Sequence, residues 1–589
     1  MKWRLKSKAP EDFIKRFPEY SSLIIQLLYD RGIETQQQID EFFNCNYKTD
    51  IHDPFLLKDM DIAVGSVLKA IKNNERIVIF GDYDADGVCS SAILYLTLKK
   101  IGADNINVYI PDRGKEGHGL NQMAVEKIIN EGAKLIITVD CGSRDIEMVD
   151  LINSLGAEII ITDHHEVGDK LPKAIAMINF HRKDDKYPFK NLAGAGVAYK
   201  LACALLSSEL AKNRKVENLK KWLLDLTAIA TVADVMPIIG ENRTLLIYGL
   251  GVLAQTKWIG LQELMNVSKL QPKISKQSVN GEAPITNLDS FTIGFVLGPR
   301  LNSAGRMDHA NVAFNLLTTE DRNEAIELAQ QLTDKNIERQ KMTDKIVMEV
   351  VKRLEKDFDK PDKPKIIFEG SPDWSVGLVG LVAGKIANKY CRPTFIYQDK
   401  GNAIHVSGRS IPQFNLIESI NECADLCVQY GGHRGAAGFV AKQDKIDEIK
   451  ERINNFADPQ INENESISII DIDSELFFDD VGWSSYNQLQ RFAPFGNANT
   501  EPKFLIKNVE VVNARTVGSD DKHLKMDIKL WNNDRKLAKN LKAIGFGLGE
   551  WANNLQTGNI VNLVFEFTVN EWNNYRDLEL RIIDLKVAT

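Results

Sequence analysis

The stretch IVIFGDYDADGV, residues 77–88, decides the fold that we predict for this chain. Its apolar beginning, Ile77–Phe80, has the composition of a buried strand, and a glycine ends it. Asp82, Asp84 and Asp86 then alternate with other residues. Side chains at positions i, i+2 and i+4 of an extended segment point to the same side, so the three carboxylates converge just beyond the strand.

Two ordinary structures also explain this acidic run. One is an Asp-rich turn, since Asp and Gly are common turn residues. The other is an EF-hand calcium loop, but its twelfth position needs a bidentate Glu, and counting from Asp82 that position is Ile93. A third interpretation is a cation site at the end of a strand in an α/β sheet, because clustered carboxylates repel one another unless a cation lies between them.

Outward from this stretch, apolar strands alternate with helices of about ten to fifteen residues. The expected pairs of strand and helix are 76–80 with 88–100, 106–110 with 121–131, and 135–139 with 145–155, and further strands are expected at 158–161 and 174–178. This alternation predicts an α/β domain with a doubly wound parallel sheet. Ligands of such sheets lie at the carboxyl ends of the strands.

Two more of these strands end in acids or imidazoles. Asp140 follows one of them, and the run Asp163, His164, His165 follows the next. A helix expected over 219–233 ends at Asp234, where a carboxylate is unfavourable to the helix dipole unless a cation balances it. A helix cap or a surface turn would explain each residue alone. Their joint position at successive strand ends predicts a metal site.

The composition limits the classes of protein to which the chain belongs. Its 589 residues predict about two to four domains. A hydrophobic content of 44% and a charged content of 26% are typical of soluble globular proteins. The net charge of −8 disfavours a surface that binds nucleic acid indiscriminately but allows a local basic groove. Seven cysteines without a CxxC pair, and no apolar leader or membrane-spanning run, predict a cytoplasmic protein without membrane contact.

The remaining chain predicts further domains. A long amphipathic helix is expected over about 320–356, followed by the charged, proline-containing linker DFDKPDKPK at 357–365. Strands and a glycine-containing helix follow, and beyond about residue 466 six short strands predict a barrel of the oligonucleotide-binding (OB) type. The aromatic residues there that we consider for stacking on bases, although more of them are expected in the core, are Phe492, Phe495, Phe504 and Trp531.

At this point the motifs resemble those of a known family. GDYDADG at 81–87, VDCG at 139–142, TDHHE at 162–166 and ADVMP at 233–237 resemble, in order, the four motifs of the DHH phosphoesterase superfamily. GPRLNSAGRM at 298–307, SGRS at 407–410, GGHRGAAGF at 431–439, PFGNANTEPKF at 494–504 and HLKM at 523–526 resemble more narrowly the RecJ family of single-strand-specific 5′→3′ exonucleases. The likeness runs from about residue 50 to the C-terminus. It departs from the family pattern at His118, Ser303 and Ser375 and within PFGNANTEP, which concerns substrate fit rather than the metal ligands.

The resemblance implies a DHH domain, a connecting helix, a DHHA1 domain and an OB domain. The parts that we expect are an N-terminal helical segment packing on the DHH domain (1–69), the DHH domain (70–319), the connecting helix and linker (320–361), the DHHA1 domain (362–458) and the OB domain (459–589). It also implies manganese or magnesium as the cofactor. Carboxylates with imidazole suit Mn²⁺ or Mg²⁺ better than zinc on chemical grounds too.

We therefore predict a site for two metal ions that hydrolyses a phosphodiester. The predicted ligands are Asp82, Asp84, Asp86, Asp140, His164 and Asp234. We expect His165 to contact the scissile phosphate and Asp163 to orient an imidazole.

A second set of residues is predicted to hold phosphates. A loop of small residues is expected over 431–438, where backbone N–H groups approach an anion closely, while Arg409 and His433 add charge-assisted hydrogen bonds. A tight turn would explain the glycines but not the clustered Arg and His. The residues predicted to bind backbone phosphates and the 5′-terminal phosphate are Arg300, Asn302, Arg306, Ser407, Arg409, Gly432 and His433.

These features predict an exonuclease that degrades single-stranded DNA from its 5′ end in DNA repair and recombination. Two alternatives remain: a DHH-family phosphodiesterase for short oligonucleotides or small nucleotides, and a non-catalytic DNA-binding scaffold. The OB-like tail and the connecting helix disfavour the first, and the complete ligand set disfavours the second. Single-stranded DNA is the expected partner of a monomer, with a single-strand-binding protein or a helicase as further candidates.

Overall fold

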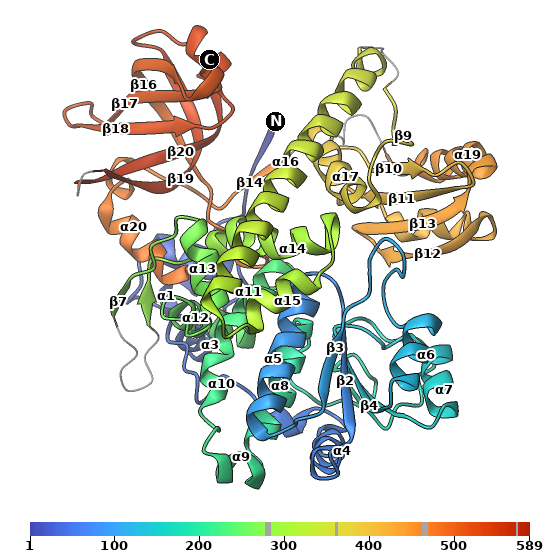
Figure 1. Cartoon of the computed structure of the whole chain (residues 1–589). Helices are drawn as coiled ribbons and strands as arrows, with labels where there is room; N and C mark the ends of the chain where they lie inside the picture. The colour runs from blue at the N-terminus through green and yellow to red at the C-terminus, as the bar shows by residue number, and fades with distance from the viewer. Residues whose placement is uncertain (277–283, 360–362, 462–468, 573–574, 589) are drawn as a thin grey trace. The chain divides into compact units, whose positions relative to one another are not determined.

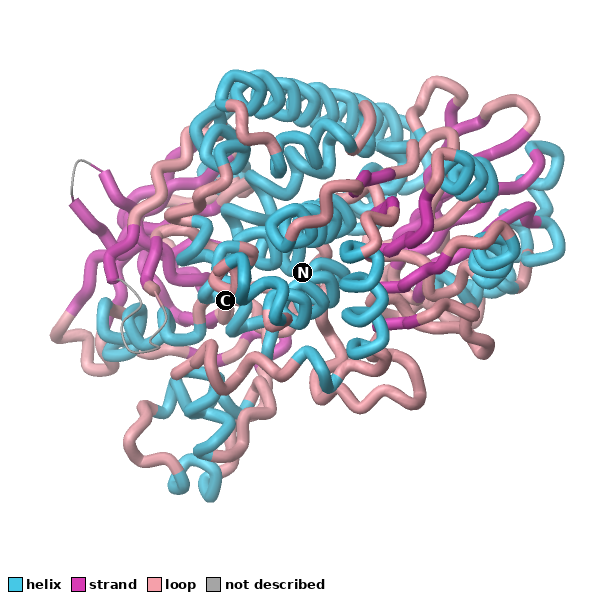
Figure 2. The backbone as a smooth tube through the Cα atoms, turned by 60° about the horizontal axis from the view of Figure 1, so that its bottom comes forward, coloured by secondary structure: helices cyan, strands magenta, loops and turns pink. Residues whose placement is uncertain are grey.

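The computed structural model describes the chain except for residues 277–283, 360–362, 462–468, 573–574 and 589 (Figure 1). It divides into two compact units: Met1–Cys45 together with Ser468–Thr589, and Asn46–Ile467. In Figure 2 the strands, in magenta, gather into separate sheets with helices, in cyan, beside them. Among the described helices, none combines the length and the apolar character that a membrane crossing needs.

A five-stranded parallel sheet forms the first part of Asn46–Ile467. Its order is β3 (Ile106–Tyr109), β2 (Arg76–Gly81), β4 (Ala133–Val139), β5 (Glu158–Thr162) and β6 (Ala176–Ile178). Beside the sheet lie α4 (Met60–Lys72), α5 (Ala85–Ile101), α6 (Gln122–Asn130), α7 (Ile146–Ser154) and α8 (Gly194–Leu206). The predicted doubly wound sheet is confirmed. Its strand order reverses between β2 and β4, which places a crevice beyond their carboxyl ends.

The period-two alternation of β2 explains why both faces of this sheet are covered. Ile77 and Ile79 belong to the core shared with α5 and α8, whereas Val78 and Phe80 belong to the core shared with α6 and α7. All four side chains are buried. A strand that is buried on both faces has a continuous run of apolar residues in its sequence, and β2 has such a run.

Helices follow the sheet in sequence. They are α9 (Glu209–Arg214), α10 (Leu219–Trp222), α11 (Leu224–Ala233), α12 (Gly240–Leu253), α13 (Ile259–Val267), a π-helix (Thr292–Leu297), α14 (Gly298–Met307), α15 (Asn311–Thr318) and α16 (Arg322–Phe358). A short pair of strands, β7 (Ile274–Lys276) and β8 (Ile285–Thr286), lies between α13 and the π-helix. The predicted connecting helix corresponds to α16, whose 37 residues are capped by Asp321. The linker expected after it lies partly outside the described residues.

A second, mixed sheet follows α16. Its order is β12 (Cys427–His433), β13 (Ala436–Lys442), β11 (Ala403–Arg409), β10 (Thr394–Asp399) and β9 (Ile367–Ser371), and its helices are α17 (Val376–Tyr390), α18 (Leu416–Asn421) and α19 (Ile446–Ala457). The loop expected over 431–438 is wrong: β12 and β13 form a hairpin in which Gly432 pairs with Ala437. A Cβ at Gly432 would lie 2.4 Å from the Cα of Ala437, so the glycine permits a strand pairing that the sequence alone presents as a loop.

The other unit contains the predicted barrel. Its strands are β15 (Ser474–Glu475), β16 (Phe504–Val517), β17 (His523–Trp531), β18 (Ala538–Gly545), β20 (Tyr575–Val587) and β19 (Ile560–Trp572), and pairing of β16 with β19 closes it. Helix α20 (Trp483–Leu489) precedes β16. The strand expected over 466–470 lies partly outside the described residues; the described β14 (Ile469–Ile472) pairs with β1 (Lys2–Leu5) instead of joining the barrel. Phe492 and Phe504 are fully buried, so they are core residues and not surfaces for base stacking.

The N-terminal segment belongs to this barrel unit. Helices α1 (Glu11–Arg16), α2 (Ser22–Tyr29) and α3 (Gln36–Phe43) share one apolar core with the barrel. The rings of Phe43 and Phe492 meet edge to face, with centroids 5.1 Å apart. The expectation that residues 1–69 pack on the domain that follows is therefore wrong for residues 1–45, because apolar spacing shows that a helix needs a partner but not which partner it takes.

Candidate metal centre and phosphate-binding cavity

The turn after β2 fixes the first carboxylates through backbone N–H groups. Asp84 caps α5, with its Oδ1 accepting hydrogen bonds from the N–H of Asp86 at 2.9 Å and of Gly87 at 3.1 Å. Asp86 is buried, and its two oxygens accept from the N–H of Gly194 and Ala195 at the start of α8, each at 2.7 Å. A helix N-terminus is a favourable place for a negative charge. Two helix starts therefore hold these carboxylates.

Asp140 and His164 reach the same point from the next two strands. Asp140 follows β4 in a left-handed conformation (φ 62°) and is buried. Its Oδ1 lies 3.1 Å from Nε2 of His164, yet it accepts no hydrogen bond. The same Nε2 lies 3.7 Å from an oxygen of Asp86 and 3.7 Å from an oxygen of Asp234, which ends α11. An unsatisfied buried carboxylate oxygen aimed at other ligand atoms suits a shared cation.

The structure brings all six predicted ligands together. Potential ligand atoms lie within 4.8 Å of one another in three overlapping groups, which are Asp82 with Asp84 and Asp140, Asp86 with His164 and Asp234, and Asp140 with His164 and His165. Burial and the neighbouring carboxylates raise the pKa of Asp84 to about 6 and that of Asp234 to about 9. They raise the pKa of Asp140 as well. A cation would remove this electrostatic cost, so the oxygen and imidazole donors fit Mn²⁺ or Mg²⁺.

Asp163 is a buried carboxylate that orients His165. Its Oδ1 is 2.8 Å from the ring Nδ1 of His165 and accepts from the backbone N–H of His164 and His165, and its Oδ2 accepts from the N–H of Ser143. Burial raises the pKa of Asp163, but the bonds and charge of His165 outweigh it and hold the pKa below its ordinary value. With Nδ1 engaged, the half-exposed His165 presents its Nε2, which forms no hydrogen bond with any described residue, to another group.

One cavity of about 820 Å³ links the edge of the first sheet with the second sheet. The lining residues that matter here are Arg113, His118, His165, Ser407, Gly432 and His433. Both walls belong to the same compact unit. Three of the predicted phosphate residues thus share a cavity with the imidazole that Asp163 orients.

Two of the predicted phosphate residues, Arg306 and Arg409, do not line this cavity but lie against glycines of α17. A Cβ at Gly377 would lie 2.5 Å from the carbonyl oxygen of Arg306, and one at Gly380 would lie 3.1 Å from Nη2 of Arg409. Arg409 donates from Nη1 to Oγ of Ser407 at 3.2 Å. Burial and the positive charge of nearby arginines lower the pKa of Arg306 to about 9. Within the described part of the chain neither arginine forms an ion pair, so their charge is available to an anion.

With this geometry in place, comparisons with known proteins identify the family. Models of the DHH family N-terminal domain, the DHHA1 domain and the RecJ OB domain match residues 76–231, 363–458 and 472–584. The single-stranded-DNA-specific exonuclease RecJ of Bacillus subtilis (strain 168) is 36% identical over 594 residues, covering 100% of this chain and 71% of that protein. The chain belongs to the RecJ family.

A second relative and a solved structure support the same family. The RecJ of Escherichia coli (strain K12) is 30% identical over 584 residues, covering 96% of both chains. A crystal structure of RecJ from Thermus thermophilus in complex with Mn²⁺ matches with a TM-score of 0.80 at 25% identity, over 100% of this chain and 80% of that one. The likeness to that structure spans both compact units.

Two predicted phosphate residues have other contacts in this RecJ-family chain. Arg300 donates to the carbonyl oxygen of Val296 at 2.7 Å and to Oγ1 of Thr333 at 3.3 Å. Asn302 accepts from the N–H of Ala85 at 2.8 Å. Neither is among the described residues that line the cavity. Asn302 instead stabilises the turn that carries the three aspartates.

Sequence reasoning missed two residues of the cavity wall. Arg113, in the loop after β3, lies with its guanidinium 4.9 Å from the ring centre of Tyr83. Its position after a strand end of the same sheet was the available signal. His118 was visible only as a departure from the family pattern; its Nδ1 is 3.1 Å from Oδ1 of Asp82, whose charge raises the pKa of His118 to about 9.

Proposed function

We propose that this chain is a metal-dependent exonuclease that degrades single-stranded DNA from the 5′ end and releases 5′-mononucleotides, in DNA repair and recombination. One observation carries the proposal: His165, whose ligand atom lies within 4.8 Å of those of Asp140 and His164, lines a single cavity that also has Ser407, Gly432 and His433 in its lining. Its volume of about 820 Å³ suits one nucleotide with its flanking phosphates. The relatives named as single-stranded-DNA-specific exonucleases support the same substrate.

The proposed cofactor is Mn²⁺ or Mg²⁺ at two positions. The ligands would be Asp82, Asp84, Asp86, Asp140, His164 and Asp234, with Asp140 shared between the groups. When bound, such ions lower the pKa of a water and neutralise charge on the phosphodiester. The chain holds these ligands in advance through the N-termini of α5 and α8.

His165 and Asp163 act at the scissile phosphate. Asp163 fixes the imidazole through Nδ1, so Nε2 is the atom that contacts a phosphate oxygen. Because Asp163 is itself held by three backbone N–H groups, of Ser143, His164 and His165, the imidazole has little freedom to turn away. Pre-organised contacts of this kind favour catalysis because no reorganisation is needed during the reaction.

The opposite wall sets the polarity. Ser407, Gly432 and His433 of this wall would bind the terminal 5′-phosphate together with Arg409, which donates to Ser407 from the neighbouring pocket. Arg306 would supply further positive charge. With that phosphate at one wall and the next phosphate at the metal centre, one nucleotide lies between them. Phosphate contacts of this type fix register without reading sequence.

The barrel, the cysteines and the partners complete the proposal. The closed barrel is proposed to bind the single strand beyond the cavity, which the match to the RecJ OB domain supports. All seven cysteines are free, which agrees with a reducing cytoplasm. We propose a monomer, with a single-strand-binding protein or a helicase as further partners.

The test is a digestion of one single strand labelled at either end. With Mn²⁺ or Mg²⁺, the 5′-labelled strand should release labelled mononucleotide at once, while the 3′-labelled strand should shorten gradually. A chelator should stop both reactions. Duplex of the same sequence is the matched control, and release of the 3′ label first would contradict the proposal.

A further inference from the structure

We infer that a second pocket beside the terminal-phosphate position receives the additional phosphates of a 5′-polyphosphorylated strand. The inference rests on the proposed function, since it assumes that Ser407 and Arg409 bind the 5′-phosphate. The pocket has a volume of about 500 Å³ and lies between α16 and α17. The lining residues that carry the argument are Arg339, Asp344, Gly380, Gly384, Lys385 and Arg409.

The two cavities meet at one pair of side chains. Ser407 lines the large cavity, Arg409 lines the second pocket, and the two are joined by the 3.2 Å hydrogen bond from Nη1 to Oγ. Gly380 lies at this junction: a Cβ there would be 2.9 Å from Oγ of Ser407 and 3.1 Å from Nη2 of Arg409. Because Gly380 has no side chain, Ser407 and Arg409 approach α17 closely, and this hydrogen-bonded pair belongs to the lining of both cavities.

The charge of the pocket suits phosphate. Three cationic side chains, Arg339, Lys385 and Arg409, face one carboxylate, Asp344, which lies 2.6 Å from Nζ of Lys385. The guanidinium of Arg339 donates to the amide oxygen of Asn336 at 2.9 and 3.2 Å. Neither Arg339 nor Arg409 has a carboxylate within ion-pair distance among the described residues. Two half-buried guanidinium groups without counter-charges favour a phosphate chain.

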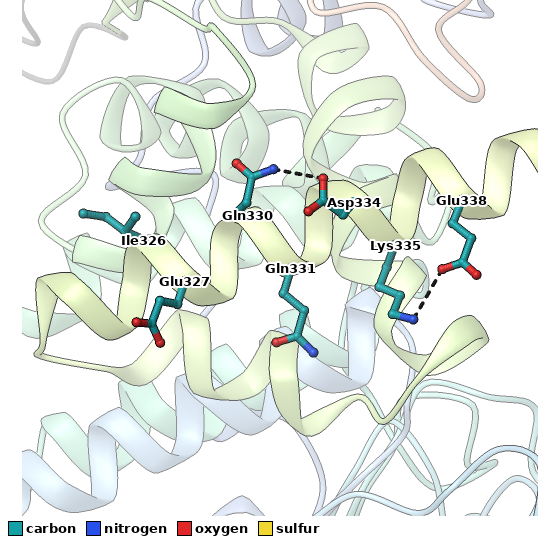
Figure 3. A pocket seen from close by; sticks show the side chains of 7 residues that line it. All are labelled: Ile326, Glu327, Gln330, Gln331, Asp334, Lys335 and Glu338. Atoms are coloured by element: carbon teal, nitrogen blue, oxygen red, sulfur yellow. Dashed lines mark hydrogen bonds and ion pairs between the residues drawn. The ribbon is translucent and has the colours of Figure 1, made fainter.

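Another pocket, lined by α16 alone, shows that an excess of positive charge is not a general property of this helix. It has a volume of about 700 Å³ and is lined by Ile326, Glu327, Gln330, Gln331, Asp334, Lys335 and Glu338 (Figure 3). Lys335 is paired with Glu338 at 3.3 Å, and Gln330 donates to Asp334 at 2.9 Å. Three carboxylates against one ammonium repel phosphate. The pocket at Arg339 is therefore distinguished by charge, not by size.

The expected substrate is a single strand whose first nucleotide carries a 5′-triphosphate. The α-phosphate occupies the Ser407 and Arg409 position, and the β- and γ-phosphates extend toward Arg339 and Lys385. The bond that breaks is unchanged: water adds to the first internucleotide phosphorus, and the 3′-oxygen of the first nucleotide leaves with a proton. The first product is then a nucleoside 5′-triphosphate, and the shortened strand carries a 5′-phosphate.

The experiment compares three strands of one sequence, bearing a 5′-hydroxyl, a 5′-monophosphate or a 5′-triphosphate. The native chain should degrade the triphosphate strand about as fast as the monophosphate strand and release a nucleoside triphosphate first. Arg339→Gln should slow the triphosphate strand about tenfold, the loss expected for one charge-assisted contact, and leave the monophosphate strand unchanged. Lys335→Gln, in the acidic pocket of the same helix, is the matched control and should change neither rate.

The outcomes separate this inference from the proposed function. Failure on the monophosphate strand contradicts the proposed function, whereas normal monophosphate cleavage with a triphosphate strand no better than the hydroxyl strand overturns only this inference. An equal effect of Arg339→Gln on both phosphorylated strands also overturns it. Lys385→Gln gives an independent reading if Arg339→Gln does not fold, and should also slow only the triphosphate strand. Inhibition by free tripolyphosphate without cleavage of the triphosphate strand would show a site for soluble polyphosphate and would contradict the assignment.

Discussion

The acidic cluster at the end of the first sheet and the arginine pair next to α17 carry opposite charge and are held in place in different ways. In the acidic cluster, backbone N–H groups of Asp86, Gly194 and Ala195 hold the side chains of Asp84 and Asp86. Burial, together with the neighbouring carboxylates, raises the pKa values of Asp84 and Asp234. Next to α17, glycines allow close approach of Arg306 and Arg409, which have no carboxylate partner among the described residues. Each cluster therefore carries charge that the described residues do not balance. In the function that we propose, metal ions balance the first and a phosphate balances the second.

The largest effect is expected from removing one ligand of the acidic cluster. Asp140→Asn should reduce cleavage by more than the about 100-fold that is usual for residues one contact away from a metal. Asp140 lies in two of the three ligand groups, so its loss affects both metal positions. The melting temperature in a chelator should not fall, because the substitution removes an uncompensated buried charge. Cleavage rate with Mn²⁺ and thermal unfolding without metal are the measurements, and near-normal turnover would contradict the two-metal site.

The second effect concerns the orientation of His165. Asp163→Asn should lower cleavage about 10- to 100-fold while metal affinity changes little, because Asp163 contacts the imidazole through Nδ1. His165→Gln should give a similar loss, and the double variant should be little worse than either single one, since the residues act as a unit. Additive losses would instead show that Asp163 has a separate role.

The third effect concerns the preference for a strand with a 5′-phosphate. Arg409→Ala should reduce the preference for a 5′-phosphate over a 5′-hydroxyl about tenfold, with the Mn²⁺ dependence unchanged. Gly380→Ala sharpens this test, since a Cβ there would displace the Arg409 guanidinium and produce a smaller loss of the same preference. Gly65→Ala in α4, where no atom from elsewhere in the described chain lies within 4 Å of the added Cβ and the backbone is helical, tests for a general effect of replacing glycine. Equal losses on both strand types would indicate a general backbone contact.

The smallest effect is on stability. Without metal, Asp84 and Asp234 have folded-state pKa values of about 6 and about 9, above the ordinary value of 3.8. The folded state then binds more protons than the unfolded state between pH 4 and pH 9, so the free energy of unfolding falls as the pH rises through this range. Chemical unfolding in a chelator at pH 5, 7 and 9 should show this decline, by about 1 to 3 kcal/mol. Added Mn²⁺ should reduce it, and a metal-independent profile would contradict the cluster.

The sequence was sufficient to predict those site residues that are metal-binding in type and that directly follow a recognisable strand. Asp82, Asp84 and Asp86 lie within five consecutive residues, and Asp140 and His164 follow apolar strands, so the rule for parallel sheets sufficed to bring them together. Arg113 follows a strand of the same sheet, but a single arginine in a polar loop gives no comparable signal. Arg306 and Arg409 belong to motifs that carried the family resemblance, yet their close approach to α17 depends on Gly377 and Gly380, which are far from them in sequence.

The sequence by itself determined the α/β class, the closed barrel and the carboxylate cluster, because strand periodicity and strand-end acids are local patterns. Only the tertiary structure decided that residues 1–45 share a core with the barrel and that residues 431–438 form a hairpin. The physical reason is the same in both cases. Apolar spacing shows which face of a helix must be buried, and glycines show where another backbone can come close. Which segment then packs against that face or pairs with that backbone is decided by contacts between parts of the chain that are far apart in the sequence.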